Sequence, residues 1–165
     1  MKQLALKLIA TGAIAVATAI PVTTLVNQAQ ASEVTEYVVE AEYEVVRQDL
    51  GDAVVNRGYK IDYNAFVGDM LARTSQDVGG KKVIYEKAEL IQFCSAVLSR
   101  DAMEADPANI AYCPYVLFVY ERADEKGKVR VGFRRLDEVG SDASKQSLAA
   151  INKVLDEIVQ EAADQ

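Results

Sequence analysis

Hydrophobic and polar residues follow two different periods along the chain. Stretches that alternate between hydrophobic and polar residues, or that are continuously apolar, indicate strands. We place these strands at 37–45, 59–64, 83–93, 115–120 and 129–134. Apolar residues spaced three and four positions apart indicate helices, at 46–57, 66–74, 95–106 and 141–165. Val97, Leu98 and Ala102 are expected to face inward from the third helix. The mixture of hairpins and helices favours an α+β fold, a small two-layer sandwich of mainly antiparallel sheet packed by helices.

The run Tyr115–Tyr120 is apolar at every position, which is typical of a central strand covered on both faces. We therefore expect Val116, Phe118 and a neighbour of theirs to be nearly inaccessible. A turn at 124–127 leads from this strand into the strand at 129–134.

The last segment of the chain reads as one amphipathic helix. Its apolar stripe consists of Leu148, Ile151, Leu155, Ile158 and Ala162. Ser141 and Asp142 supply a cap and an acidic first turn. We expect this helix, residues 141–165, to pack on the domain formed by residues 32–140 or on a second subunit.

The first 31 residues read as a signal peptide. Lys2 and Lys7 precede an uncharged apolar stretch over 8–26, which ends near the small-residue motif Ala29-Gln30-Ala31. The alternative is an uncleaved membrane anchor, because the apolar stretch could just span a bilayer. We expect cleavage after Ala31, export to the periplasm or outside the cell, and no stable membrane insertion of the mature chain.

Composition excludes several classes of function. The chain of 165 residues has a net charge of −7, and removal of residues 1–31, with two lysines and no acidic residue, makes it −9. Such an acidic chain is not expected to bind nucleic acid or anionic lipid. The sequence contains no histidine, which excludes Ser-His-Asp and Cys-His catalytic sets and histidine-ligated zinc or haem. We expect no cofactor and no metal.

Cys94 and Cys113 are the only two cysteines. In an exported chain, two cysteines most often form a structural disulfide, and the helix and loop between them are short enough to allow it. A second interpretation is a redox or sulfur-carrying thiol at Cys94, near the start of a helix. A third adds Met70 and Met103 as soft ligands for Cu(I), although roughly 13 Å of helix would separate Met103 from Cys94.

Five other residues are candidates for ligand binding: Arg73, Ser95, Ser99, Tyr115 and Arg134. Ser95 and Ser99 lie one helical turn apart and could line a pocket, or could serve as a cap and a solvated position. Arg73 could instead interact with the C-terminal end of its helix. Arg134 and the neighbouring Arg135 could hold an anion or form surface ion pairs. The eight tyrosines are expected mainly in the core and at its rim.

The chain from about Val45 to Arg135 resembles the family called domain of unknown function 302. The resemblance rests on five short stretches: Gly58-Tyr59, Gly68-Asp69-Met70-Leu71-Ala72-Arg73-Thr74, Phe93-Cys94-Ser95-Ala96, Asp106-Pro107 and Cys113-Pro114-Tyr115. It is nearest to a secreted branch with two cysteines. The resemblance implies a small α+β sandwich and allows a homodimer. It supplies no reaction, and it leaves the final helix outside the shared part.

These observations leave two classes of function. The first is an exported, periplasmic accessory module without catalytic activity, which binds a small ligand or a periplasmic protein. The second is a thiol-based redox or sulfur-carrier protein that uses Cys94 and Cys113. The absence of histidine, the commonest general base, favours the first class.

Overall fold

The computed structural model describes residues 34–164. The expected signal peptide, residues 1–31, lies outside this part of the chain. The elements in chain order are β1 (Val34–Val39), α1 (Tyr43–Asn56), β2 (Ile61–Ala65), α2 (Val67–Thr74), β3 (Tyr85–Phe93), α3 (Ala96–Ala105), the 3-10 helix η1 (Pro107–Tyr112), β4 (Tyr115–Arg122), β5 (Val129–Arg134) and α4 (Asp142–Ala163).

The five strands form one sheet in the order β1-β5-β4-β3-β2. All four neighbouring pairs are antiparallel. The apolar strand β4 is therefore the central one, as its sequence predicts. The α+β fold with a mainly antiparallel sheet packed by helices is confirmed.

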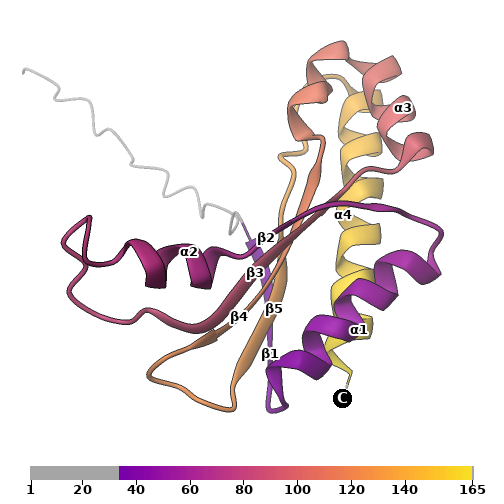
Figure 1. Ribbon diagram of the computed structural model, residues 1–165. Helices are drawn as coiled ribbons and strands as arrows, with labels where there is room; N and C mark the ends of the chain where they lie inside the picture. The colour runs from indigo at the N-terminus through magenta and orange to yellow at the C-terminus, as the bar shows by residue number, and fades with distance from the viewer. Residues whose placement is uncertain (1–33, 165) are drawn as a thin grey trace, which may run out of the picture. The chain divides into compact units, whose positions relative to one another are not determined.

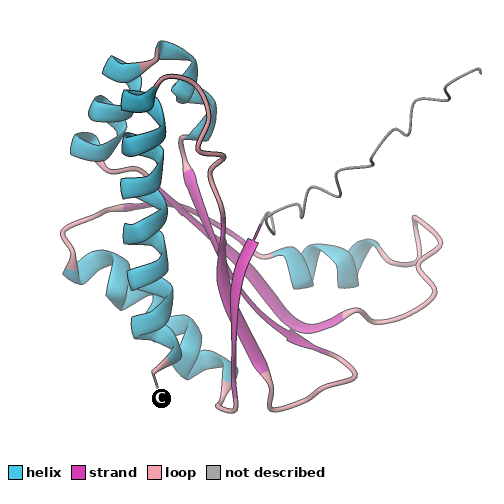
Figure 2. Cartoon of the chain, turned by 180° about the vertical axis from the view of Figure 1, so that it is seen from behind, coloured by secondary structure: helices cyan, strands magenta, loops and turns pink. Residues whose placement is uncertain are grey.

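The helices are distributed unevenly over the sheet. Figures 1 and 2 show α1, α3 and α4 together on one face, with α2 alone on the other. The main core lies between the sheet and the three helices, and its largest fully buried side chains include Leu50, Phe93, Leu117, Phe133 and Leu155. Below we call the other side of the sheet, which carries only α2, the open face.

The start of the domain differs from the sequence prediction. The strand expected at 37–45 covers Val34–Val39, and helix α1 already begins at Tyr43. The alternation of Val39, Ala41 and Tyr43 looks like a strand, but Tyr43, Val46 and Leu50 are also spaced as one helical stripe. All three are buried, so burial of that stripe decides the local structure.

Two residues expected in the core lie elsewhere. Leu117 and Val119 of β4 are fully buried, but Phe118 between them is only half-buried because it points to the open face. Val97 of α3 is 69% exposed, since α3 packs through Ala102 and, in part, Leu98. Both predictions were therefore wrong, and the reason is the same: an apolar pattern does not show which face receives a covering layer.

Helix α4 is an integral part of the core. The stripe of Leu148, Ile151, Leu155 and Ile158 is at most 1% exposed. On the same helix, the buried Asn152 side chain donates to the Leu136 carbonyl oxygen and accepts from the Leu136 N–H, both at 2.9 Å. The expected cap is present, because Ser141 Oγ accepts from the Ser144 N–H. Among the described residues, no helix has the length and apolar character needed to cross a membrane.

Candidate functional site

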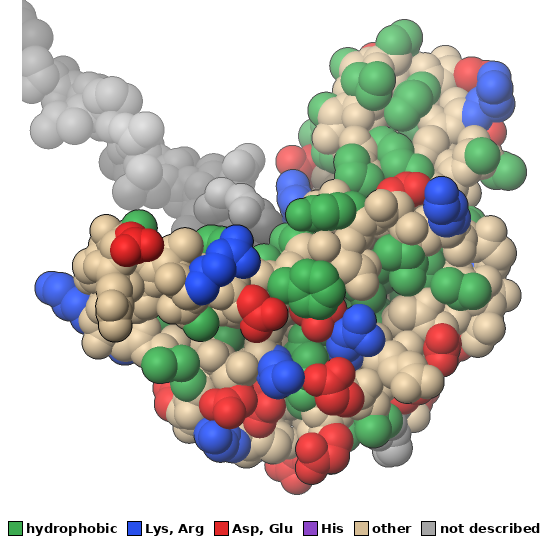
Figure 3. All heavy atoms as spheres, viewed as in Figure 1, with side chains coloured by type: hydrophobic (Ala, Val, Ile, Leu, Met, Phe, Trp, Pro, Cys, Tyr) green, Lys and Arg blue, Asp and Glu red, His purple; other side chains and the backbone are tan. Residues whose placement is uncertain are grey.

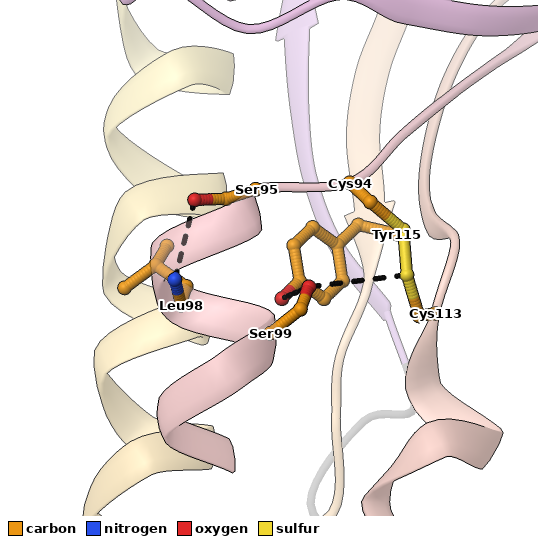
Figure 4. Close-up of a disulfide and its surroundings, with 6 residues drawn as sticks. All are labelled: Cys94, Ser95, Leu98, Ser99, Cys113 and Tyr115. Atoms are coloured by element: carbon orange, nitrogen blue, oxygen red, sulfur yellow. Dashed lines mark hydrogen bonds between the residues drawn. A yellow bond between two sulfur atoms is a disulfide. The ribbon is translucent and has the colours of Figure 1, made fainter. Parts of the chain in front are cut away.

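Cys94 and Cys113 are brought to disulfide distance at one end of the sheet (Figure 4). Cys94 directly follows β3, and Cys113 lies between η1 and β4. Their Cα atoms are 6.2 Å apart, within the roughly 7 Å that a disulfide requires. The bond ties the end of β3 to the start of its neighbour β4, around the excursion through α3 and η1.

A short polar chain leads from β4 to the disulfide. The hydroxyls of Tyr115 and Ser99 are 2.9 Å apart, and Ser99 Oγ lies 3.9 Å from Cys113 Sγ. Burial raises the pKa of the Tyr115 phenol, although the contact with Ser99 opposes the shift. Tyr115 therefore remains protonated at neutral pH, and its hydroxyl can donate to Ser99 while Ser99 donates to the sulfur.

Three of the five ligand-binding candidates, Ser95, Ser99 and Tyr115, lie together beside the disulfide (Figure 4). Ser95 is buried, and its hydroxyl oxygen accepts from the Leu98 N–H as a helix cap. Tyr115 is also buried. The contacts around these side chains are with the protein itself, so the binding role of this group stays a prediction.

The two arginine candidates lie apart from each other. Arg134 ends β5 and lines a shallow hollow of about 240 Å³ together with Tyr112 and Pro114. Arg73 is in the last turn of α2, as expected, and lines a different hollow with Tyr63 and Phe66. Nothing brings these two guanidinium groups together, and their binding roles also stay predictions.

The described residues contain no group of three histidine, cysteine, aspartate or glutamate side chains that could hold a metal ion. Both cysteines are joined to each other, so neither is a free thiolate ligand. Met70 lies on α2 and Met103 on α3, helices on opposite faces of the sheet (Figure 1). The described residues therefore do not assemble the soft-ligand set that the copper interpretation requires.

The open face of the sheet is largely apolar at its centre. Strand register places Glu36, Gly132, Phe118 and Leu90 in one row across β1, β5, β4 and β3. Hydrophobic side chains in β2 and in its connection to α2 reach solvent: Tyr63 and Phe66 are at least half exposed. Figure 3 shows hydrophobic side chains at the surface among charged side chains of both signs.

A hollow of about 290 Å³ lies in this open face, between the sheet and the start of α2. Below we call it the aromatic hollow. Its wall includes Val67 of α2 and three aromatic side chains, and its lining contains mostly apolar residues. Its lining includes Glu36, Val67, Tyr85, Leu90, Phe118 and Tyr120.

Two glycines allow the aromatic hollow to form. A Cβ built on Gly132 would lie 2.8 Å from Phe118 Cε2, so the Phe118 ring lies across the bare backbone of β5. A Cβ built on Gly68 would lie 2.8 Å from the Ala88 backbone nitrogen. Since real Cβ atoms do not approach so closely, glycine at 68 lets α2 come close to β3 and glycine at 132 lets Phe118 lie flat.

The rim of the aromatic hollow carries a polar cluster. The Tyr120 hydroxyl donates to Glu36 Oε2 at 2.7 Å, and Arg130 Nε lies 3.5 Å from Glu36 Oε1. Arg130 is also paired with Glu125. Burial, together with the bond to the Glu36 carboxylate, raises the pKa of Tyr120 to about 12. Tyr120 is therefore a neutral donor at every physiological pH.

Sequence reasoning missed the aromatic hollow. Phe118 and Tyr120 were interpreted as core because the whole of β4 is apolar, and Glu36 precedes the stretch assigned to the first strand. One signal was available: Gly132 stands in the polar row of β5, between Arg130 and Arg134. A glycine in a strand often marks a close approach by another group.

The comparisons with known proteins agree on the family. The family model described as "Domain of unknown function DUF302" matches residues 35–165. The match includes α4, so the expectation that the final helix lies outside the shared part was wrong. No curated protein matches the chain.

One solved structure with a similar fold is the crystal structure of an uncharacterized conserved DUF302 protein from Bacillus stearothermophilus. It has 16% sequence identity and a TM-score of 0.66, and the match covers 80% of this chain and 99% of that chain. At this identity the likeness supports the fold alone. The match of the family model over residues 35–165 shows that the chain belongs to the DUF302 family.

Proposed function

We propose that the mature protein is an exported binding module without catalytic activity, and that it binds its ligand on the open face of the sheet. The observation that carries this proposal is the unequal covering of the two faces. Three helices bury one face, whereas the other holds only α2 and retains the aromatic hollow between α2 and the sheet. A concave apolar site with a few polar groups at its rim is the usual form of a small-molecule site.

The chemistry of the side chains supports binding rather than catalysis. The described residues contain no candidate metal cluster, and the chain has no histidine. The largest described pKa shifts belong to tyrosines and raise the pKa, so these phenols stay protonated at neutral pH and supply almost no phenolate as a base or nucleophile. Export is proposed from the amino-terminal sequence, and a disulfide is compatible with an oxidising compartment.

Ligand mapping by NMR would test the proposed binding face. A panel of small amines, organic acids and neutral compounds would be added to labelled protein, and perturbed amides would be assigned. We expect the perturbations to gather on β3, β4 and the start of α2. Phe118→Asp, which places a charge in the hollow, should abolish them, whereas Val97→Asp on exposed α3 should not. Perturbations confined to the helix-covered face would overturn the proposal.

Export can be tested separately by mass spectrometry of protein recovered from its native compartment. Cleavage after Ala31 gives a chain that begins at Ser32. A membrane-embedded species that retains Met1 would contradict export by a cleaved signal.

A thiol-based function is the second candidate, and the contact between Ser99 and Cys113 favours it. If an external dithiol attacked Cys94 Sγ, the S–S bond would break, a mixed disulfide would form at Cys94, and Cys113 would leave as a thiolate. The Ser99 hydroxyl, 3.9 Å from that sulfur, could stabilise the leaving thiolate. Labelling native protein with a maleimide tests this function: thiols that label without prior reduction favour it, and two blocked cysteines favour the binding module.

A further inference from the structure

The aromatic hollow presents three rings to a common space. Tyr85 and Tyr120 meet edge to face with centroids 5.4 Å apart, and the centroids of Phe118 and Tyr120 are 6.0 Å apart. The faces of such rings carry negative charge density, which attracts a cation within about 6 Å of the centroid. Three adjacent rings therefore favour a positively charged ligand over a neutral one of the same shape.

Formal charge around the aromatic hollow favours the same sign of ligand. Of its ten lining residues, Glu36 and Glu89 are acidic and none is a lysine or arginine. Arg47 Nε contacts both carboxylate oxygens of Glu89, at 3.0 and 3.1 Å, so Glu89 is already neutralised. Of the two acidic lining residues, Glu36, at the rim of the aromatic hollow, is therefore the one whose negative charge can attract a ligand.

The charges near Glu36 do not cancel it completely. Arg130 is the cation beside it, but Arg130 also pairs with Glu125. Glu125 also pairs with Arg122, which pairs in turn with Asp124, so two guanidinium groups serve three carboxylates and the cluster keeps a net negative charge. Arg130 also shows that Tyr120 accepts a cation, because its guanidinium carbon lies 5.8 Å from the centre of that ring.

The size of the aromatic hollow limits the ligand. Its volume of about 290 Å³ is near the lower end of the roughly 300–1,000 Å³ that small-molecule sites occupy. Apolar contacts with Val67, Leu90 and Phe118 require that the ligand carry carbon around its charge. A large or strongly hydrated ion does not meet these conditions.

We propose that the aromatic hollow binds a small organic cation, an ammonium group with apolar substituents. The three rings and Leu90 surround its apolar part, and the Glu36 carboxylate lies on the side where the positive charge is. This assignment deepens the proposed function and rests on the open face being the binding face.

The test compares choline with its neutral isostere 3,3-dimethylbutan-1-ol, and with the anion 3,3-dimethylbutanoate, by NMR titration of the full mature chain. We expect choline to bind about ten-fold more tightly than the neutral isostere. The anion should bind more weakly still, because the rim carries a carboxylate. The perturbed amides should lie beside Phe118 and Tyr120.

Two variants separate the contributions of charge and ring. Glu36→Gln removes the charge but keeps an oxygen that can accept from the Tyr120 hydroxyl, and it should weaken choline binding about three- to five-fold. Phe118→Leu keeps an apolar side chain without the ring, and it should weaken choline binding while the neutral isostere changes little. Glu40→Gln, at an exposed position outside the hollow, is the matched control for net charge.

The outcomes distinguish this inference from the proposed function. Equal affinities for choline and its isostere at the hollow would overturn the preference for cations and leave an apolar binding face intact. Absence of choline binding while other compounds of the panel bind the open face would also overturn the cation assignment alone. A preference for choline that is unchanged in both Glu36→Gln and Phe118→Leu would overturn the assigned residues and with them the proposal.

Discussion

The Phe118 ring lies directly over Gly132 on the neighbouring strand, with Phe118 Cε2 only 2.8 Å from where a Cβ of residue 132 would be. This contact fixes the ring at the floor of the aromatic hollow. It also makes residue 132 a sensitive position, because the built Cβ would clash with the Thr35 carbonyl oxygen on its other side. A side chain at 132 must therefore displace a ring or separate two strands.

Gly132→Ala should lower the free energy of unfolding by about 1–3 kcal/mol, the usual range for overpacking. Chemical denaturation would measure the loss. Gly51→Ala is the matched control, because a Cβ at position 51 of α1 meets only Ile61 Cδ1 at an ordinary 3.9 Å. In a helix interior that change should stabilise the protein by up to about 1 kcal/mol. Equal effects of the two substitutions would contradict the packing described for Phe118.

Replacing both cysteines by alanine should destabilise the protein by about 3 kcal/mol, because the disulfide closes a loop with a sequence separation of 19 residues. Urea unfolding of the oxidised protein and of the Cys94→Ala/Cys113→Ala variant would measure this difference. The variant should be insensitive to reducing agents. If a reducing agent also leaves the stability of the wild-type protein unchanged, the pair is not bonded in solution.

Asn152→Leu should cost about 2–6 kcal/mol, although leucine and asparagine differ little in size. The substitution leaves the buried N–H and carbonyl of Leu136 without the partners that Asn152 supplies at 2.9 Å, and each orphaned group costs about 1–3 kcal/mol. Thermal and denaturant unfolding would report the loss. Lys153→Leu, at the next and exposed position of α4, is the control and should change stability little.

Alkaline pH should destabilise the fold in a way that depends on Tyr120. The unfolded phenol loses its proton near pH 10, while the folded one holds it to about pH 12. The folded state therefore binds the proton more tightly, so this contribution to stability is complete below pH 10 and is lost as the pH rises through 12. The free energy of unfolding, measured from pH 8 upward, should fall less steeply in Tyr120→Phe. Identical slopes for both proteins would refute the shift.

The sequence predicts the fold class well, because hydrophobic periodicity decides most elements. The spacing of Leu148, Ile151, Leu155 and Ile158 is a strong helical signal, and their burial confirms it. Gly58, with a positive φ of 81°, follows the end of α1, a position where glycine commonly terminates a helix. Strand β4 was placed correctly at the centre of the sheet for a similar reason, since no polar position interrupts it.

The candidate site could be predicted only in part. Two cysteines in a chain with an apparent signal peptide point to a disulfide, and the structure brings them to bonding distance. The aromatic hollow depends instead on tertiary facts that no local pattern contains: which face of the sheet receives three helices, and where α2 returns onto β3. Phe118 illustrates this, because its neighbours Leu117 and Val119 have the same apolar character and lie fully buried on the other side.

Strand β1 gives the fold a particular order of assembly. Its Val39 pairs with Val129, ninety residues later, and the Tyr37 hydroxyl donates to Asp156 Oδ1 at 2.8 Å. Strand β1, the first of the described strands to be synthesised, therefore has no partner strand until β5 has left the ribosome. A nascent chain that still lacks β5 and α4 has β1 unpaired and the helix-binding face of the sheet uncovered, which exposes it to aggregation.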